Sequence, residues 1–167
     1  MSDTEDFFEY FQRQELEAFV LTPLPKTLAQ AEAEVHYCRE MFRKSAGIYW
    51  SIVMQDTGKM VGAIGLYPNN QHNRMEVSYD LSPDYWRRGI MTKALKVATE
   101  VALSGLQVGR VEATTVLFNT ASQELLRKCG YHEEGILKNY KWYNGQAHDV
   151  NMFARINPAL SAPEHTG

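Results

Sequence analysis

A chain of 167 residues is long enough to bury a substantial core as a single domain without disulfide support. Its hydrophobic fraction of 44% and charged fraction of 22% are those of an ordinary globular protein. The 17 Lys and Arg residues against 20 Asp and Glu residues give a net charge of -3, which argues against a dedicated nucleic-acid-binding protein.

Cysteine, histidine and terminal patterns exclude several further classes. Cys38 and Cys129 lie far apart and match no metal or redox spacing, and the five histidines are scattered, so we expect no bound metal. The acidic start lacks the order of a signal peptide, and no apolar run approaches the roughly 20 residues that a membrane span needs. The sequence therefore predicts a cytoplasmic protein with reduced cysteines and no membrane association.

The amino-terminal part is expected to form two helices and a hairpin. Residues 7–19 have apolar side chains at mixed helical spacings, and two prolines follow them. Thr27-Leu28-Ala29-Gln30 has a capping-box pattern that begins a second helix, which continues to about Lys44. Residues 48–55 and 60–67 are rich in β-branched and aromatic side chains around a glycine turn, which predicts a hairpin.

The rest of the chain alternates between strand and helix patterns and ends in a second hairpin around Asn144-Gly145. The order predicts a mixed α/β (α+β) domain over residues 1–157, with a strand–helix–strand crossover at its centre. Residues 158–167 have no apolar periodicity and are expected to be a flexible tail. The expected elements are strands at 75–81, 110–116, 136–143 and 147–156, and helices at 89–104 and 120–129.

The junction before the helix that starts at Gly89 has the features of a phosphate site. The start of a helix has unsatisfied N–H groups and a partial positive charge. Gly89 lets a ligand approach the backbone, Arg87 and Arg88 add positive charge, and Thr92 adds a hydroxyl in the first turn. A solvent-exposed helix cap would have the same residues, so this pattern alone indicates only some phosphate ligand.

The wider pattern resembles the coenzyme A loop of the GNAT superfamily of N-acetyltransferases. Arg-Arg-Gly-Ile-Met-Thr at 87–92 follows Ser-Pro-Asp-Tyr-Trp at 82–86, and Asn-Thr-Ala-Ser at 119–122 begins the last helix. Asn144-Gly145 and Asp149 fall where the RimJ/RimL-like branch has its final glycine and aspartate, and the resemblance covers roughly residues 48–155. It implies the GNAT fold, a mixed and largely antiparallel central sheet with flanking helices, splayed at the acetyl-CoA site.

Three features depart from the family pattern. Trp86 stands where many members have Gln or Arg, and Met91 where many have Gly or Ala, although both residues are familiar in the RimJ/RimL-like branch. Residues 1–10 offer no convincing first strand, although related proteins usually begin with one. We therefore expect the edge of the sheet to differ, and the coenzyme site to be retained.

The resemblance also implies roles for individual residues. Glu76 aligns with the glutamate that serves as base in several members, often through water, although an exposed strand glutamate would look the same. Ser122 is placed to assist the departing thiolate, while Asn119 contacts the coenzyme or caps its helix. A backbone N–H around Leu81 or Ser82 is expected to stabilise the oxyanion. The coenzyme contacts implied are Leu81, Ser82, Trp86, Arg87, Arg88, Gly89, Ile90, Met91, Thr92, Asn119 and Ser122.

The expected function is acetyl transfer from acetyl-CoA to a primary amine, of the ribosomal-protein N-terminus type, by direct attack in a ternary complex. A small-molecule amine acetyltransferase and a catalytically silent acyl-CoA-binding module are the alternatives. Tyr140, Trp142 and Tyr143 are candidates for lining the acceptor pocket, although such aromatic residues often form core or cross-strand pairs. Exposed strand edges in this fold also favour a homodimer.

Overall fold

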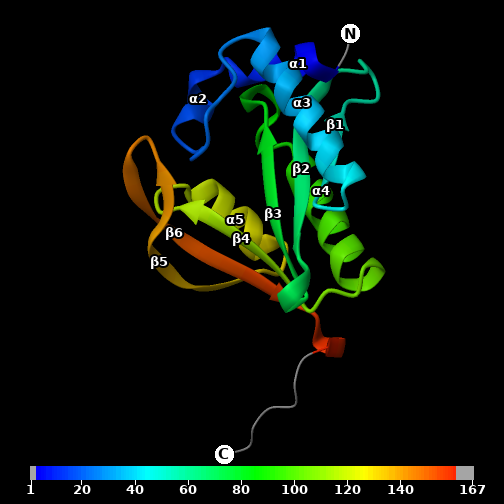
Figure 1. Cartoon of the computed structure of the whole chain (residues 1–167), viewed down its shortest axis with the longest axis vertical. Coiled ribbons are helices and arrows are strands. Elements are labelled where there is room, and N and C mark those ends of the chain that lie inside the picture. The colour runs from blue at the N-terminus through cyan, green and yellow to red at the C-terminus, as the bar shows by residue number, and fades with distance from the viewer. Residues whose placement is uncertain (1–2, 161–167) are drawn as a thin grey trace, which may run out of the picture.

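The structure is a computed structural model that describes residues 3–160, in which helices cover both faces of a six-stranded sheet (Figure 1). The strand order is β1-β2-β3-β4-β6-β5. The helices are α1 (Asp3–Phe11), α2 (Gln14–Glu17), α3 (Leu28–Arg43), α4 (Ile90–Glu100) and α5 (Thr120–Lys128). The strands are β1 (Ile48–Val53), β2 (Met60–Asn69), β3 (Arg74–Leu81), β4 (Arg110–Val116), β5 (His132–Tyr143) and β6 (Gln146–Ile156).

The elements from the second helix onward occur in the predicted order, which confirms the mixed α/β architecture. Thr27 caps α3 as expected, because its Oγ1 accepts a hydrogen bond from the N–H of Gln30. The reciprocal bond is displaced by one residue, since the side chain of Gln30 accepts from the N–H of Lys26. Within residues 3–160 no strand precedes β1, so the sheet begins at the first hairpin.

The single helix predicted over residues 7–19 is wrong. The chain forms α1 from Asp3 and a separate short α2, because Arg13 at the start of α2 has an extended backbone. The guanidinium of Arg13 donates a 2.6 Å hydrogen bond to Asp84, which lies beyond β3. Apolar side chains on both sides of this break pack together, with Tyr10 and Leu16 meeting Met60 of β2. Tertiary packing therefore bends a segment whose local pattern suggested one helix.

Three other boundaries differ from the sequence prediction. α4 ends at Glu100 and continues as a π-helical turn, Val101–Gly105. β5 begins at His132 instead of Ile136, and its register shifts at two bulges, which hide its strand pattern in the sequence. Pro158–Leu160 form a 3₁₀ turn, and the remainder of the predicted tail lies outside the described residues.

The parallel pairing of β3 with β4 is short, and this shapes the centre of the molecule. The two strands are in register only at Arg74–Arg110, Met75–Val111 and Glu76–Glu112. β3 then stays with β2 up to Leu81, and β4 stays with β6 up to Val116. The strands consequently diverge and leave a V-shaped opening, which Figure 1 shows between β3 and β4.

An ion-pair network fixes the closed end of this opening. Glu112 is buried at 5% exposure and accepts hydrogen bonds from Arg74 at 3.1 Å and from Arg110 at 2.9 Å. The guanidinium of Arg110 also forms a bidentate pair with Glu134 on β5, at 2.7 and 2.6 Å. The network therefore links the first residues of β3 and β4 to the outermost strand.

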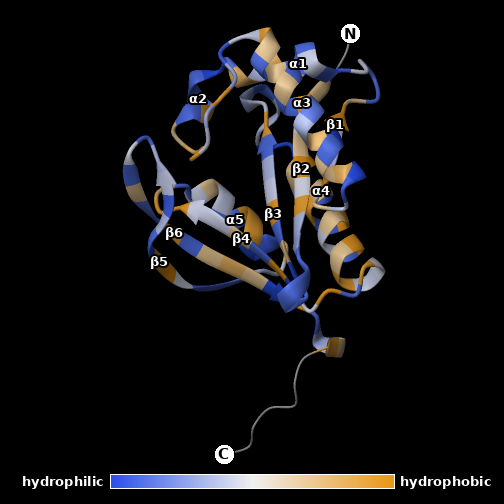
Figure 2. Ribbon diagram, viewed as in Figure 1, coloured by the Kyte–Doolittle hydropathy of each residue, from blue (hydrophilic) through white to orange (hydrophobic). Residues whose placement is uncertain are grey.

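The two faces of the sheet pack against different helices. The main core joins α4 and α5 to one face, with Leu66, Leu95 and Leu126 fully buried. Figure 2 shows apolar and polar residues alternating along α4, as expected of a helix with one buried side. A smaller core lies under α1 on the other face, and α3 adjoins it. We call these the α4/α5 face and the α1/α3 face.

Side chains of a strand point alternately to the two faces, which sorts the residues of β3. Val77, Tyr79 and Leu81 belong to the α4/α5 face, where Val77 and Leu81 join the main core. Glu76 and Asp80 belong to the α1/α3 face, where Asp80 meets Tyr10 of α1. Among residues 3–160, no helix is both long enough and apolar enough to cross a membrane.

Replacing Glu112 by Ala should lower the free energy of unfolding by about 2 kcal/mol, because Arg74 and Arg110 lose their buried counter-charge. Glu134→Ala, at the exposed end of the same network, should lower it by less than about 1 kcal/mol. Urea denaturation of both variants measures the difference. Equal losses would show that the buried carboxylate does not hold the closed end of the V.

Candidate functional site

A cleft of about 1840 Å³ passes through the V-shaped opening. Its walls are the diverging parts of β3 and β4, the first turns of α4 and α5, the segment between α2 and α3, and α3 itself. Of the residues predicted to act in catalysis or to contact the coenzyme, all line this cleft except Ser82 and Arg88. The cleft reaches both faces of the sheet. Ser122 of α5 lines it on the α4/α5 face, and the cross-strand pair Tyr67 and Glu76 lines it on the α1/α3 face.

The N-terminus of α4 is open to a ligand. Gly89 occupies the N-cap position with a left-handed backbone (φ 74°), which glycine adopts without steric cost. No side chain within residues 3–160 caps this helix, whereas Thr27 caps α3 and Asn119 caps α5. The first N–H groups of α4 are therefore left for a ligand, and together with the helix dipole they favour an anion.

The loop before α4 is fixed by its tryptophan. Nε1 of Trp86 donates a 2.8 Å hydrogen bond to the carbonyl oxygen of Leu81, which closes the loop back onto the end of β3. Arg87 has a left-handed backbone (φ 60°), a conformation that is uncommon outside glycine and that often marks a ligand-binding segment. Arg87 lines the cleft, so the loop presents a cation beside the N-terminus of α4.

Two residues predicted to contact the coenzyme turn away from the cleft. The guanidinium of Arg88 lies over the ring of Tyr85 at 4.9 Å and borders a separate small pocket. Ser82 is buried, and its N–H donates a 2.7 Å hydrogen bond to the carbonyl oxygen of Val61. The charge of Arg88 is therefore directed elsewhere, and the Ser82 amide is used within the sheet.

The backbone of β3 still offers amides to the cleft. In an antiparallel ladder, alternate residues direct their N–H groups toward opposite neighbouring strands. Because Ser82 bonds to β2, the N–H groups of Tyr79 and Leu81 face the side from which β4 has diverged. These two amides are the available donors at the expected oxyanion position.

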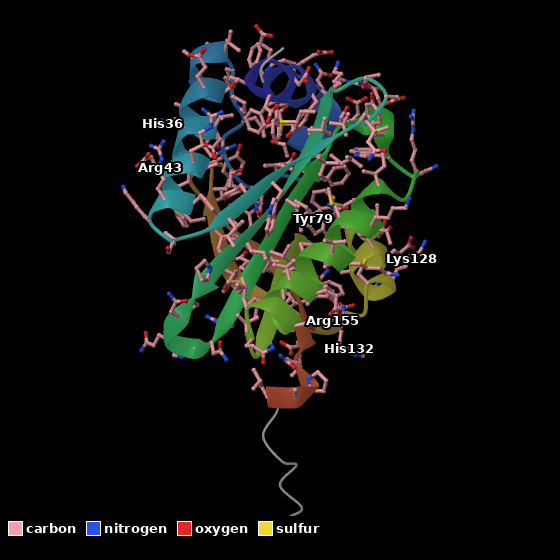
Figure 3. The ribbon with its side chains drawn as sticks, turned by 90° about the vertical axis from the view of Figure 1, so that its right-hand side faces the viewer. His36, Arg43, Tyr79, Lys128, His132 and Arg155 are labelled. Atoms are coloured by element: carbon pink, nitrogen blue, oxygen red, sulfur yellow. The ribbon has the colours of Figure 1, made fainter. Side chains whose placement is uncertain are left out.

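A hydroxyl pair bridges the V on the α4/α5 face. The hydroxyls of Ser122 and Tyr79 share a hydrogen bond of 2.7 Å, and the N–H of Ser122 donates to the side-chain oxygen of Asn119 at 3.1 Å. Asn119 thus caps α5, which was one of the two roles predicted for it from the sequence. Burial raises the pKa of Tyr79, so its phenol remains protonated at neutral pH. Figure 3 shows Tyr79 near the centre of the molecule, beside α4.

Glu76 occupies the vertex of the V on the opposite face. It is the last residue of β3 that pairs with β4, and its partly exposed carboxylate lines the cleft. Nζ of Lys141 donates a hydrogen bond to Glu76 at 3.2 Å. The sequence offered no sign of this partner, because β5 brings Lys141 to the site from 65 residues further along the chain.

Several residues that line the cleft have no signature in the sequence. Tyr79 and Asp80 look like ordinary strand residues until the register of β3 is known, and both line the cleft. Thr115 also lines it, and its buried hydroxyl has no hydrogen-bond partner among residues 3–160. Of the terminal hairpin, Lys141 and Val150 reach the cleft, and the aromatic residues proposed for the acceptor pocket do not. Those residues are Tyr140, Trp142 and Tyr143.

Asp149 has a structural position, since it accepts hydrogen bonds from the side chain of Lys138 and from the N–H of Asn139 at a bulge of β5. Among the described residues 3–160, no group of three or more His, Cys, Asp or Glu side chains is arranged to hold a metal ion.

Comparison with known proteins places this geometry in a family. A model of the acetyltransferase (GNAT) domain matches residues 1–132. The uncharacterized N-acetyltransferase YoaA of Bacillus subtilis (strain 168) is 29% identical over 157 residues, covering 93% of this chain and 89% of that protein. Spermidine N(1)-acetyltransferase of Escherichia coli (strain K12) is 28% identical over 95 residues, covering 56% of this chain and 51% of that protein.

A solved structure supports the same fold. RimL, a ribosomal L7/L12 α-N-protein acetyltransferase solved in complex with coenzyme A, matches with a TM-score of 0.81 at 21% identity. The match covers 95% of this chain and 92% of that one. The open helix N-terminus, the splayed strands and these matches agree: the chain belongs to the GNAT acetyltransferase family and is an N-acetyltransferase that uses acetyl-CoA.

Proposed function

We propose that the acceptor is the α-amine of a protein N-terminus, of the ribosomal-protein type, and that it attacks acetyl-CoA directly in a ternary complex. The observation that carries this mechanism is the position of Glu76 and the Ser122–Tyr79 pair on opposite faces of one opening through the sheet. An amine and a thioester can therefore meet inside the V from opposite sides, so no covalent enzyme intermediate is needed.

In this proposal the coenzyme enters from the α4/α5 face. The free amides of the first turn of α4, Gly89 and Arg87 hold its pyrophosphate. Its arm then lies between β3 and β4, where the buried hydroxyl of Thr115 is available to a polar atom of the arm. The N–H groups of Tyr79 and Leu81 receive the thioester oxygen as negative charge develops on it.

Each proton of the reaction has a proposed destination. The amine nitrogen forms a bond to the acetyl carbon and loses a proton to Glu76, directly or through a water. The carbon–sulfur bond breaks, and the thiolate receives a proton from Ser122, which Tyr79 replenishes through their shared hydrogen bond. A proton from solvent then restores Tyr79. Burial raises the pKa of Tyr79, so its phenol is protonated at neutral pH, and any phenolate formed in this step quickly regains a proton.

A protein N-terminus suits this site chemically. The pKa of an α-amine is about 7.7–8.0, against about 10.4 for lysine. An α-amine therefore gives up its proton to Glu76 more easily than a lysine side chain does. The likeness to RimL supports this acceptor class through the fold. The cleft also extends beyond the V to the segment between α2 and α3, which leaves room for residues that follow the amine.

A small polycationic amine is the second candidate acceptor. Five acidic residues line the cleft, and a spermidine acetyltransferase is among the relatives. The five are Asp3, Glu34, Glu76, Asp80 and Glu124. Acetyl transfer to peptides with different first residues, compared with transfer to spermidine and short diamines, separates the two classes. Turnover of peptides alone supports the N-terminal acceptor, and turnover of polyamines alone overturns it.

Gly89→Glu should weaken acetyl-CoA binding at least about tenfold, because it places a negative charge beside the pyrophosphate. Isothermal titration calorimetry measures the affinity. Gly58→Glu is a matched control, since Gly58 also has a left-handed backbone (φ 67°) and open surroundings but lies in the β1–β2 turn. Equal affinities for the two variants would place the pyrophosphate elsewhere.

Ser122→Ala and Tyr79→Phe should each lower kcat by about tenfold to a hundredfold, with little change in the affinity for acetyl-CoA. Because the two hydroxyls act through one hydrogen bond, the double variant should lose little more than either single variant. Steady-state kinetics of the three variants tests this. Fully multiplicative losses would contradict a shared proton path.

Glu76→Gln should lower kcat/KM by about a hundredfold near neutral pH and by clearly less above pH ~9, where solvent hydroxide can accept the proton. Lys141→Ala serves as the companion variant, because it removes the ion-pair partner and keeps the carboxylate. A pH–rate profile for each variant is the measurement. A loss for Glu76→Gln that is the same at every pH argues against proton transfer to this residue.

A further inference from the structure

A protonated amine must lose two protons on its way to an amide, and the mechanism above assigns only one of them. The first must leave before attack, because an ammonium nitrogen has no free electron pair. The second leaves as the carbon–nitrogen bond forms, and the proposal above gives it to Glu76. The destination of the first proton is inferred below and rests on that proposed function.

Asp80 lies on the same face of β3 as Glu76, with Ser78 between them. At about 3.3 Å per residue, the Cα atoms of Glu76 and Asp80 are roughly 13 Å apart. Ser78 is small and exposed, and all three side chains line the cleft. An amine nitrogen above Ser78 can therefore reach both carboxylates, directly or through one water.

Asp80 is held in one orientation by α1. The hydroxyl of Tyr10 donates a 2.6 Å hydrogen bond to Oδ1 of Asp80. Tyr10 is itself buried at 4% exposure and packs edge-on against Phe7, with ring centroids 5.7 Å apart. The carboxyl group is thus fixed on one side by a residue that has little freedom to move.

The charge environment of Asp80 differs from that of Glu76. Glu76 is paired with Lys141, whereas among residues 3–160 no lysine, arginine or histidine forms an ion pair with Asp80. The titratable groups near it are Tyr10 of α1 and Cys38 of α3. Burial raises the pKa of the Tyr10 phenol and raises the pKa of the Cys38 thiol to about 11, so both are neutral. A partly buried carboxylate without a cation leaves room for the ammonium of a substrate.

Burial raises the pKa of Asp80 to about 6, and hydrogen bonds from the Tyr10 hydroxyl and from the backbone N–H of Ala63 oppose this rise. At neutral pH the group is therefore ionised and is a stronger base than an exposed aspartate.

We infer that Asp80 is a second catalytic carboxylate, which binds the incoming ammonium and takes its first proton. The nitrogen then attacks the acetyl carbon and gives its second proton to Glu76, while the thiolate leaves and is protonated from Ser122. Two protons leave nitrogen and one arrives on sulfur. Solvent then takes the protons held by Asp80 and Glu76 and returns one to the Ser122–Tyr79 pair, so one proton is released in all. Tyr10 is a positioning residue in this scheme.

Asp80→Asn tests the assignment with little risk to folding, because the amide keeps the size of the carboxyl group and can still accept from Tyr10. For the wild-type enzyme and its best peptide acceptor, kcat/KM should fall below a pH near 6. In Asp80→Asn this acidic limb should disappear, and kcat/KM at neutral pH should fall at least tenfold. Glu76→Gln should keep the limb and lower the plateau above it.

Tyr10→Phe distinguishes a role of Asp80 in proton transfer from a purely structural role. It removes the hydrogen bond that lowers the pKa of Asp80, so the acidic limb should move to higher pH. Asp56→Asn, the same chemical change in the β1–β2 turn, should leave the profile unchanged. An acidic limb that is identical in the wild type and Asp80→Asn overturns the inference, even if Glu76 and Ser122 behave as proposed.

A binding measurement separates this inference from the proposed function. Calorimetry with coenzyme A bound and the peptide amine as titrant involves no acetyl transfer. The affinity at pH 7 should fall at least tenfold in Asp80→Asn and should be unchanged in Asp56→Asn. Equal affinities for wild type and Asp80→Asn overturn the role of Asp80, whatever the enzyme turns over.

Discussion

The three-residue pairing of β3 with β4 is the constraint on which the rest of the structure depends. Each strand keeps a full partner on its other side, so their divergence does not unfold the sheet. It does leave the inward-facing amides of β3 without a strand partner, and such groups need another source of hydrogen bonds. A ligand that lies between the strands supplies one. The ion pairs around Glu112 hold the closed end of the opening and thereby set where it begins.

The opening also explains how one short strand can serve both reactants. Consecutive residues of β3 point to opposite faces, so Tyr79 and Asp80 are neighbours in the chain and act on different sides of the sheet. In our account the thiolate leaves toward the hydroxyl pair on the α4/α5 face, and the amine arrives at the carboxylates on the α1/α3 face. The backbone amides of the same strand lie between the two. A change of register by one residue would exchange these roles.

Much of this arrangement could be predicted from local sequence. Gly89 before an apolar helix, Asn119 three residues before Ser122, and the hairpin at Asn144-Gly145 each report a local backbone requirement, and each element is present. What could not be predicted depends on tertiary register. The direction of Arg88, the use of the Ser82 amide within the sheet, and the pairing of Lys141 with Glu76 have no local signature. The break between α1 and α2 likewise follows from packing on β2.

The proposed mechanism requires acetyl-CoA to occupy the V between β3 and β4 with its thioester beside Ser122. A crystal structure of the complex with coenzyme A tests it most directly. We expect the pyrophosphate at the first turn of α4, the arm between the diverging strands, and the sulfur within hydrogen-bond distance of Ser122 Oγ. A coenzyme arm that lies outside the V, or a sulfur atom on the α1/α3 face beside Glu76, would contradict it.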